Sequence, residues 1–285
     1  MNLTETSLTD AVLARMDGSD DVRFKVLMTS LVRHLHDFIR EVGLTEAEWK
    51  AGIDFLTATG QKCDDRRQEY ILLSDTLGVS MLVDAINHRF PAGATETTVF
   101  GPFFVEGAPE RPMWADIRGG ARGVPCFVSG TVRDTAHRPV ADAVVDVWQS
   151  DGEEGLYDVQ RPGGELQCRA RFRTDASGRF ALRTVQPVSY PVPTDGPVGR
   201  MLLKMGRHPY RPAHIHTMIT RDGFRPLTTH LFVAGDPYLD SDAVFGVKAS
   251  LVVDFVRHGP GPAPDGSTMS EPFVTVDYDF VLAPA

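Results

Sequence analysis

The segment Tyr210-Arg211-Pro212-Ala213-His214-Ile215-His216 leads into an apolar, β-prone stretch that runs to Thr220. This pattern predicts a strand, and on a strand the side chains of residues i and i+2 point to the same face of the sheet. His214 and His216 would therefore hold two imidazoles side by side on a rigid element, which is half of a metal site. Arg211, three residues before His214, adds a fixed positive charge nearby.

Two tyrosines upstream lie in short segments punctuated by glycine or proline. Tyr157 is part of Gly155-Leu156-Tyr157-Asp158, and Tyr190 is part of Pro187-Val188-Ser189-Tyr190-Pro191-Val192-Pro193. A His-x-His pair alone is more often structural than metal-binding, and a single tyrosine is more often a core residue than a ligand. Two phenols together with two imidazoles, however, form an unusual donor set that suits ferric iron.

Taken in order, Tyr157, Tyr190, Arg211, His214 and His216 resemble the motifs of the intradiol ring-cleaving dioxygenases. These are non-haem Fe(III) enzymes that open catechols between the two hydroxyl groups in the catabolism of aromatic compounds. The resemblance extends from about Arg23 to about Tyr278 and implies one Fe(III) per subunit, bound by the two tyrosines and the two histidines. It also implies two catalytic roles: Tyr190 is the ligand released when substrate binds, and Arg211 stabilises negative charge that develops on the ring.

The sequence pattern changes near residue 100, from one typical of helices to one typical of short strands. Before it, apolar residues recur at steps of three and four along one expected helix, and Thr45 with Glu48 forms a capping box that opens the next. After Gly101-Pro102, short β-rich runs alternate with turn residues; one hairpin is expected at Asp175-Ala176-Ser177-Gly178, and the last strand at residues 273–281. We therefore expect a mainly β protein, with N-terminal helices (residues 1–100) as a dimerisation linker and a β-sandwich catalytic core (residues 101–285). The apolar helical stripe consists of Phe24, Leu27, Leu31, Leu35, Phe38 and Val42.

The residues around Gly101-Pro102, together with Leu72 and Asp75, are similar to the branch of the family whose substrate is hydroxyquinol, benzene-1,2,4-triol. That branch implies 3-hydroxy-cis,cis-muconate as the product, which tautomerises to maleylacetate. Asp75 can accept a hydrogen bond from the third ring hydroxyl, which catechol lacks, although on its own the position is typical of a solvated helix residue. The candidate pocket residues are Leu72, Asp75, Val99, Phe100, Gly101, Pro102, Phe103, Val192, Pro193, Arg211 and Val244.

Composition sets further limits on function. The net charge of −9, without a cluster of Lys and Arg, argues against nucleic-acid binding. No apolar run approaches the length of a transmembrane helix, and the N-terminus lacks the features of a signal peptide. The three cysteines, Cys63, Cys126 and Cys168, form no CxxC motif and are expected to be free thiols in a cytoplasmic protein.

The expected partners are a small aromatic diol or triol and O2. The resemblance further implies a twofold homodimer at the N-terminal helices, with a phospholipid in an apolar tunnel at that interface. Three other functions stay open: cleavage of catechol or chlorocatechol, metal binding by a sandwich without catalysis, and zinc-dependent hydrolysis through His214 and His216. His208, His230, Tyr210 and Tyr238 are expected to be structural, with a pocket position as a second possibility for His230.

Overall fold

The computed structural model describes residues 3–64, 67–161, 163 and 166–285. It divides into two compact units, residues 1–58 and 59–285. The predicted division at residue 100 follows the change from helices to strands along the chain, and as a domain boundary it stays a prediction. Among the described residues, no helix is both long enough and apolar enough to cross a membrane.

The first unit is helical, with α1 (Leu8–Ala14), α2 (Val22–Val42) and the beginning of α3 (Glu46–Gln61). Helix α2 begins after Asp21, whose carboxylate accepts a hydrogen bond from the Phe24 N–H, and it ends at Gly43 with φ of 58°. The predicted capping box before α3 is confirmed, because the Thr45 N–H donates to Glu48 and the Glu48 N–H donates to the Thr45 hydroxyl. The stripe residues of α2 each leave about half of their surface exposed.

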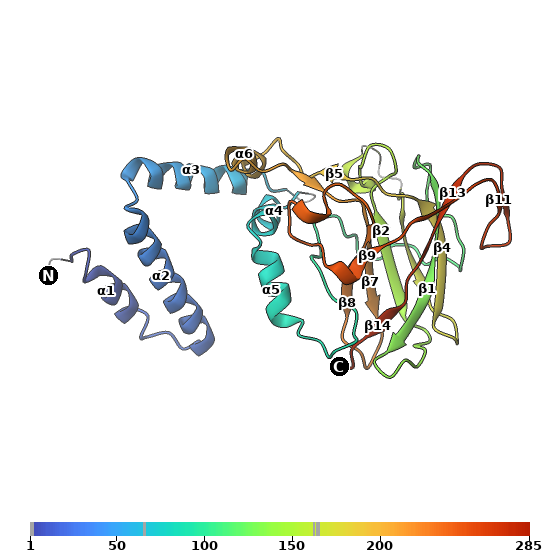
Figure 1. Cartoon of the computed structure of the whole chain (residues 1–285). Coiled ribbons are helices and arrows are strands. Elements are labelled where there is room, and N and C mark those ends of the chain that lie inside the picture. Colours follow the sequence, from blue (N-terminus) through green and yellow to red (C-terminus); the bar gives the residue numbers. More distant parts are fainter. Residues whose placement is uncertain (1–2, 65–66, 162, 164–165) are drawn as a thin grey trace. The chain divides into compact units, whose positions relative to one another are not determined.

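The second unit contains two five-stranded sheets among the described residues, and they enclose one apolar core (Figure 1). The first sheet has the order β3-β2-β7-β8-β9. In the second sheet, β13 and β14 pair one after the other with successive parts of β1, β4 also pairs with β1, and β10 pairs with β13. The core takes Val145, Phe172 and Ile219 from the first sheet and Val128 and Leu182 from the second. The predicted β-sandwich preceded by N-terminal helices is thus confirmed.

The remaining elements of this unit have the following bounds. The helices are α4 (Glu69–Thr76), α5 (Val79–Asn87) and α6 (Pro197–Lys204). The strands are β1 (Pro125–Asp134), β2 (Val144–Gln149), β3 (Arg169–Arg173), β4 (Arg179–Val185), β5 (Tyr190–Pro191), β6 (Tyr210–Arg211), β7 (His214–Thr220), β8 (Leu227–Val233), β9 (Val252–Val253), β10 (Val256–His258), β11 (Gly261–Pro262), β12 (Thr268–Met269), β13 (Phe273–Asp277) and β14 (Phe280–Leu282).

The last predicted strand, residues 273–281, is wrong as a single element, because the structure splits it into β13 and β14. The break follows from side-chain chemistry. The Asp279 carboxylate accepts the N–H of Thr131 at 2.9 Å, so a side chain occupies a donor of β1 at this point. The backbone of Tyr278 approaches β1 so closely that a Cβ on Gly130 would lie 1.9 Å from the Tyr278 carbonyl oxygen.

One register row crosses four strands of the first sheet and consists of polar and aromatic side chains. Arg169 of β3 opposes Trp148 of β2, Trp148 opposes His216 of β7, and His216 opposes His230 of β8. Directly opposed residues of antiparallel strands project to the same face of a sheet. His214 lies two residues before His216 and shares this face, so the sheet gathers the four side chains of the row and His214 on one side.

Candidate metal centre

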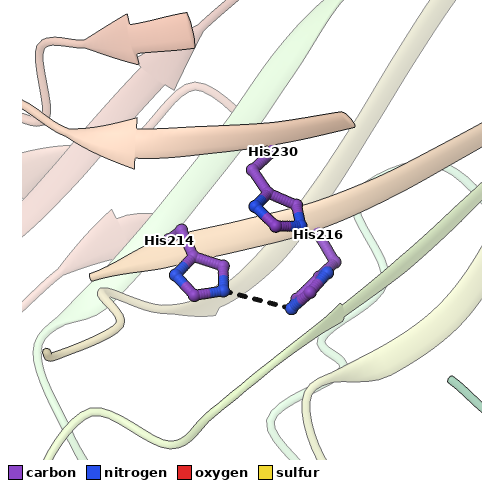
Figure 2. A group of neighbouring side chains, drawn as sticks. All are labelled: His214, His216 and His230. Carbon is purple, nitrogen blue, oxygen red and sulfur yellow. Dashed lines mark hydrogen bonds between the residues drawn. The ribbon is translucent and has the colours of Figure 1, made fainter. Parts of the chain in front are cut away.

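Four donor atoms converge above this face of the first sheet. The Oη of Tyr157 lies 3.0 Å from Nε2 of His216 and 3.4 Å from Nε2 of His214. The Nε2 atoms of His214 and His216 are 3.1 Å apart, and a dashed line joins these two residues in Figure 2. Oη of Tyr190 lies 3.2 Å from Oη of Tyr157. All four side chains are buried. The structure therefore brings together the four ligands expected from the sequence.

The donors are positioned by several elements of local structure. Strand β7 places both histidines, and β5 places Tyr190 directly opposite Arg211 of β6. Tyr157 precedes a short helical turn, and its backbone N–H donates to the Gln160 side-chain oxygen at 2.9 Å. Gly155, with φ of 70°, lets the chain pass Tyr190, because a Cβ at this position would lie 2.6 Å from the Tyr190 Cβ.

The two histidine rings are oriented for ligation. Nδ1 of His214 lies 2.7 Å from the Pro212 carbonyl oxygen, to which it donates, so the lone pair of Nε2 faces the other donors. The His216 ring stacks on Trp148, with ring centroids 4.7 Å apart and an interplanar angle of 16°. Gly101 passes close to the other edge of His216, because a Cβ there would lie 3.2 Å from its Cε1.

The electrostatics of this cluster favour the binding of a cation. Burial raises the pKa of Tyr157 well above its ordinary value and also raises the pKa of Tyr190. Burial, assisted by the charge of Arg211, lowers the pKa of His214 well below its ordinary value. The neutral phenols and imidazoles thus face one another, and a metal ion bound among them would favour the phenolate forms. Two hard oxygen donors with two imidazoles fit iron.

Arg211 is buried at the edge of the donor cluster. Its Nη1 lies 3.2 Å from Nε2 of His214, and its Nε donates to the Asp242 carboxylate at 3.1 Å. Asp242 in turn accepts the N–H groups of Val244 and Gly246, so its own position is fixed. The guanidinium is therefore held beside the donor atoms with a defined orientation.

His230 was expected to be structural, with a pocket position as the second possibility, and the structure places it against His214 and His216 (Figure 2). Its ring stacks on His214 with centroids 4.6 Å apart, and it contacts His216 edge to face at 4.0 Å. The ring lies near the main chain of Val99, but among the described residues neither of its nitrogens has a well-directed hydrogen bond. The position of His230 follows from the pairing of β7 with β8, because their register places His230 opposite His216.

The predicted pocket residues divide into two groups. A cavity of about 190 Å³ has Leu72, Pro102, Phe103 and Pro193 among its lining residues. The other predicted residues are not among those that line it in the described chain. Of these, Asp75, Val99, Val192, Arg211 and Val244 are buried, Gly101 is partly buried, and Phe100 is 43% exposed.

Comparison with known proteins agrees with this geometry. A family model described as "Dioxygenase" matches residues 99–284, and one described as "Catechol dioxygenase N terminus" matches residues 21–95. The 6-chlorohydroxyquinol 1,2-dioxygenase of Cupriavidus pinatubonensis is 55% identical over 98% of this chain and 97% of its own length. For the hydroxyquinol 1,2-dioxygenase of Rhodococcus opacus the identity is 54%, over 98% of this chain and 94% of the relative. The solved structure of hydroxyquinol 1,2-dioxygenase from Pseudomonas putida DLL-E4 superposes with a TM-score of 0.91 at 53% identity, over 99% of each chain.

Proposed function

Because the chain belongs to the intradiol ring-cleavage dioxygenase family, we propose that it cleaves hydroxyquinol between the adjacent hydroxyl groups with O2. The product is 3-hydroxy-cis,cis-muconate, which tautomerises to maleylacetate, and both oxygen atoms of O2 enter it. The names of three relatives, which act on hydroxyquinol or its chloro derivative, support this substrate. The observation that carries the proposal is the buried four-donor cluster beside Arg211.

The cofactor is one Fe(III) per subunit, bound by Tyr157, Tyr190, His214 and His216. Two phenolates balance much of the charge of a trivalent ion, which favours the ferric over the ferrous state. Bound there, iron supplies a Lewis acid that makes the chelated catecholate reactive toward O2. A wine-red colour from tyrosinate-to-iron charge transfer is the direct sign of this centre, because zinc or an empty site is colourless.

Two residues of the site have separate roles, since Tyr190 takes up a proton and Arg211 stabilises negative charge. Tyr190 would be the ligand that the metal releases as the substrate binds, and its Oη would then accept a proton from a substrate hydroxyl. Burial raises the pKa of Tyr190, while the charge of Arg211 opposes part of this increase. Arg211 stays positive beside Asp242 and stabilises the negative charge that develops on the ring in a site that excludes water.

Asp75 is the residue that would select the third hydroxyl. Its side chain lies on α4, three residues after Leu72, and only 4% of it is exposed. Burial raises the pKa of Asp75, while a hydrogen bond from Ser80 and the charge of Arg211 oppose the increase. A buried acceptor left without its partner is costly, so a substrate without the third hydroxyl should bind less well in the transition state.

The experiment that tests the substrate is oxygen uptake by iron-loaded protein with hydroxyquinol, catechol and 4-chlorocatechol side by side. We expect hydroxyquinol to be consumed far faster than the other two. Uptake with catechol that equals or exceeds uptake with hydroxyquinol would make catechol 1,2-dioxygenase the better assignment. Iron-loaded protein without oxygen uptake on any of the three would leave a metal-binding sandwich.

The N-terminal helices are proposed to form a twofold homodimer, with residues 1–100 as the dimerisation region and 101–285 as the catalytic domain. The stripe on α2 supports this, because half-exposed apolar side chains that gather on one helix face mark an interface. An apolar tunnel between two such faces would hold the chains of a phospholipid. Light scattering at micromolar concentration tests the dimer, and mass spectrometry of extracted lipid tests the tunnel.

The free thiols of Cys63, Cys126 and Cys168 support a cytoplasmic location.

A further inference from the structure

We propose that Arg169 is a positioning residue that fixes the Tyr157 phenol for iron ligation. The inference rests on the proposed ligation of iron by Tyr157. Arg169 lies on β3, outside the donor cluster, and none of the four donors is its hydrogen-bond partner among the described residues. It would therefore act through the groups that hold Tyr157 in place.

The first of these groups is the carboxylate of the residue that follows Tyr157. Nε of Arg169 donates to Oδ2 of Asp158 at 2.8 Å, and Nη2 donates to Oδ1 at 2.5 Å. Both side chains are only 2% exposed. Asp158 opens the helical turn after Tyr157, so this two-point contact anchors the backbone from which the phenol projects.

The second group is the aromatic ring that covers the phenol. Nη2 of Arg169 also donates to the Phe103 carbonyl oxygen at 2.8 Å. The Phe103 ring stacks on the Tyr157 ring with centroids 4.3 Å apart and an interplanar angle of 28°. One guanidinium thus fixes both the chain beside Tyr157 and the surface on which its ring rests. A third link runs along the sheet, where Arg169 opposes Trp148, on which the His216 ring stacks.

A gain in folding stability does not by itself explain the buried ion pair of Arg169 and Asp158. Removing two charges from water is expensive, and replacing a buried pair by apolar residues is often neutral or stabilising. What the pair does provide is direction, because a planar fork with several donors fixes the relative positions of Asp158 and Phe103. Groups that orient metal ligands in this way typically change metal affinity or activity about 10–100-fold when they are replaced.

Arg171 provides a matched control on the same strand. It follows Arg169 by two residues, so it projects to the same face of the sheet. Its Nε donates to the Ala108 carbonyl oxygen at 2.7 Å, so it also ties a loop to β3, but it touches neither Asp158 nor Phe103 through a described hydrogen bond. Replacing Arg171 by methionine therefore reproduces the loss of a loop anchor without the loss of the Tyr157 contacts.

The test compares Arg169→Met, Arg169→Lys and Arg171→Met with the parent protein. Iron affinity is measured by titrating apoprotein against a competing chelator, the tyrosinate band by visible absorption, and folding by the melting temperature of the apoprotein. We expect Arg169→Met to bind iron about 10–100-fold more weakly and to shift or weaken the band per bound iron. Arg169→Lys, which cannot span both Asp158 oxygens and the Phe103 carbonyl, should lose less, and Arg171→Met should keep the parental affinity and band.

Parental affinity and band in Arg169→Met would overturn the inference, and so would equal losses in Arg169→Met and Arg171→Met. If Arg169→Met does not fold, Arg169→Lys decides: a lowered affinity with an altered band supports the inference, and parental values refute it. A parent protein that binds no iron would instead refute the proposed function on which the inference rests.

Discussion

Tyr190 and Arg211 oppose each other directly in the register of β5 and β6, so the phenol and the guanidinium project to the same side of this short ladder. Asp242 holds the far side of the guanidinium, and His214 lies 3.2 Å from its Nη1. Arg211 therefore cannot turn away from the donor cluster. A positive charge is fixed where Tyr190 would leave the metal and where negative charge would develop on the substrate.

Arg211→Met should lower kcat by about 10²–10³-fold, the usual result of removing one aimed donor at a site of developing charge. Iron content and colour should persist, because the four donors stay in place. Steady-state kinetics with metal analysis checks this, and Arg207→Met is the control. Arg207 is a neighbouring, partly buried arginine that binds the carbonyls of Thr76 and Ala243, so its loss should leave most of the activity. Equal activity in both variants would contradict the role of Arg211.

The two tyrosines should differ in what they do to colour and iron. Tyr157→Phe removes the oxygen that lies within 3.4 Å of both Nε2 atoms, so iron affinity and most of the visible band should be lost. Tyr190→Phe leaves three donors, so it should keep iron with a weaker band and turn over slowly. Visible absorption and iron analysis distinguish the two variants. Tyr278→Phe is the control, because its hydroxyl donates to the Ser250 carbonyl and to none of the four donors through a described hydrogen bond. Full colour in both ligand variants would rule out tyrosinate ligation.

Asp75→Ala should reduce kcat/KM for hydroxyquinol and change that for catechol much less. Loss of a hydrogen bond to a charged acceptor is worth about 1.5–3 kcal/mol, which corresponds to roughly a tenfold to hundredfold loss. The control is Asp84→Ala, because Asp84 is also buried but accepts hydrogen bonds from Thr97 and His88 instead. It should change both substrates alike. Equal losses on the two substrates in Asp75→Ala would mean that Asp75 is structural.

Ionisation of Asp146 should lower the free energy of unfolding, so that the protein is less stable above neutrality than at acidic pH. Burial raises its pKa from 3.8 to about 6, although the charges of Arg171 and Arg169 oppose the increase. A raised pKa means that the folded state holds the proton more tightly, so this contribution to stability is present below pH 4 and is lost as the pH rises through 6. Asp146→Asn should therefore raise the free energy of unfolding at pH 8 by about 1–3 kcal/mol, and by less at pH 5. Urea unfolding at both pH values checks this, and a variant less stable than the parent at pH 8 would contradict it.

Much of the candidate metal centre could be predicted from the sequence, because its expected ligands lie in short motifs that resemble those of a known family. The alternation in β7 predicts that His214 and His216 share a face, and Gly155 marks the segment in which the chain passes close to Tyr190. His230 and Arg169 could not be assigned in this way. Their positions depend on the strand order β3-β2-β7-β8 and its register, which join residues far apart in the chain. Arg169 also needs Phe103, 66 residues earlier, to complete its contacts.

The central claim, ferric intradiol cleavage of hydroxyquinol, is tested most directly by oxygen uptake with isotopically labelled O2 in the purified iron-loaded protein. The account predicts one O2 consumed per hydroxyquinol, both labelled atoms in the ring-opened product, and much slower uptake with catechol and 4-chlorocatechol. Removal of iron should abolish uptake, and reloading should restore it. Uptake that persists without iron, a product that carries a single labelled atom, or catechol cleaved as fast as hydroxyquinol would contradict it.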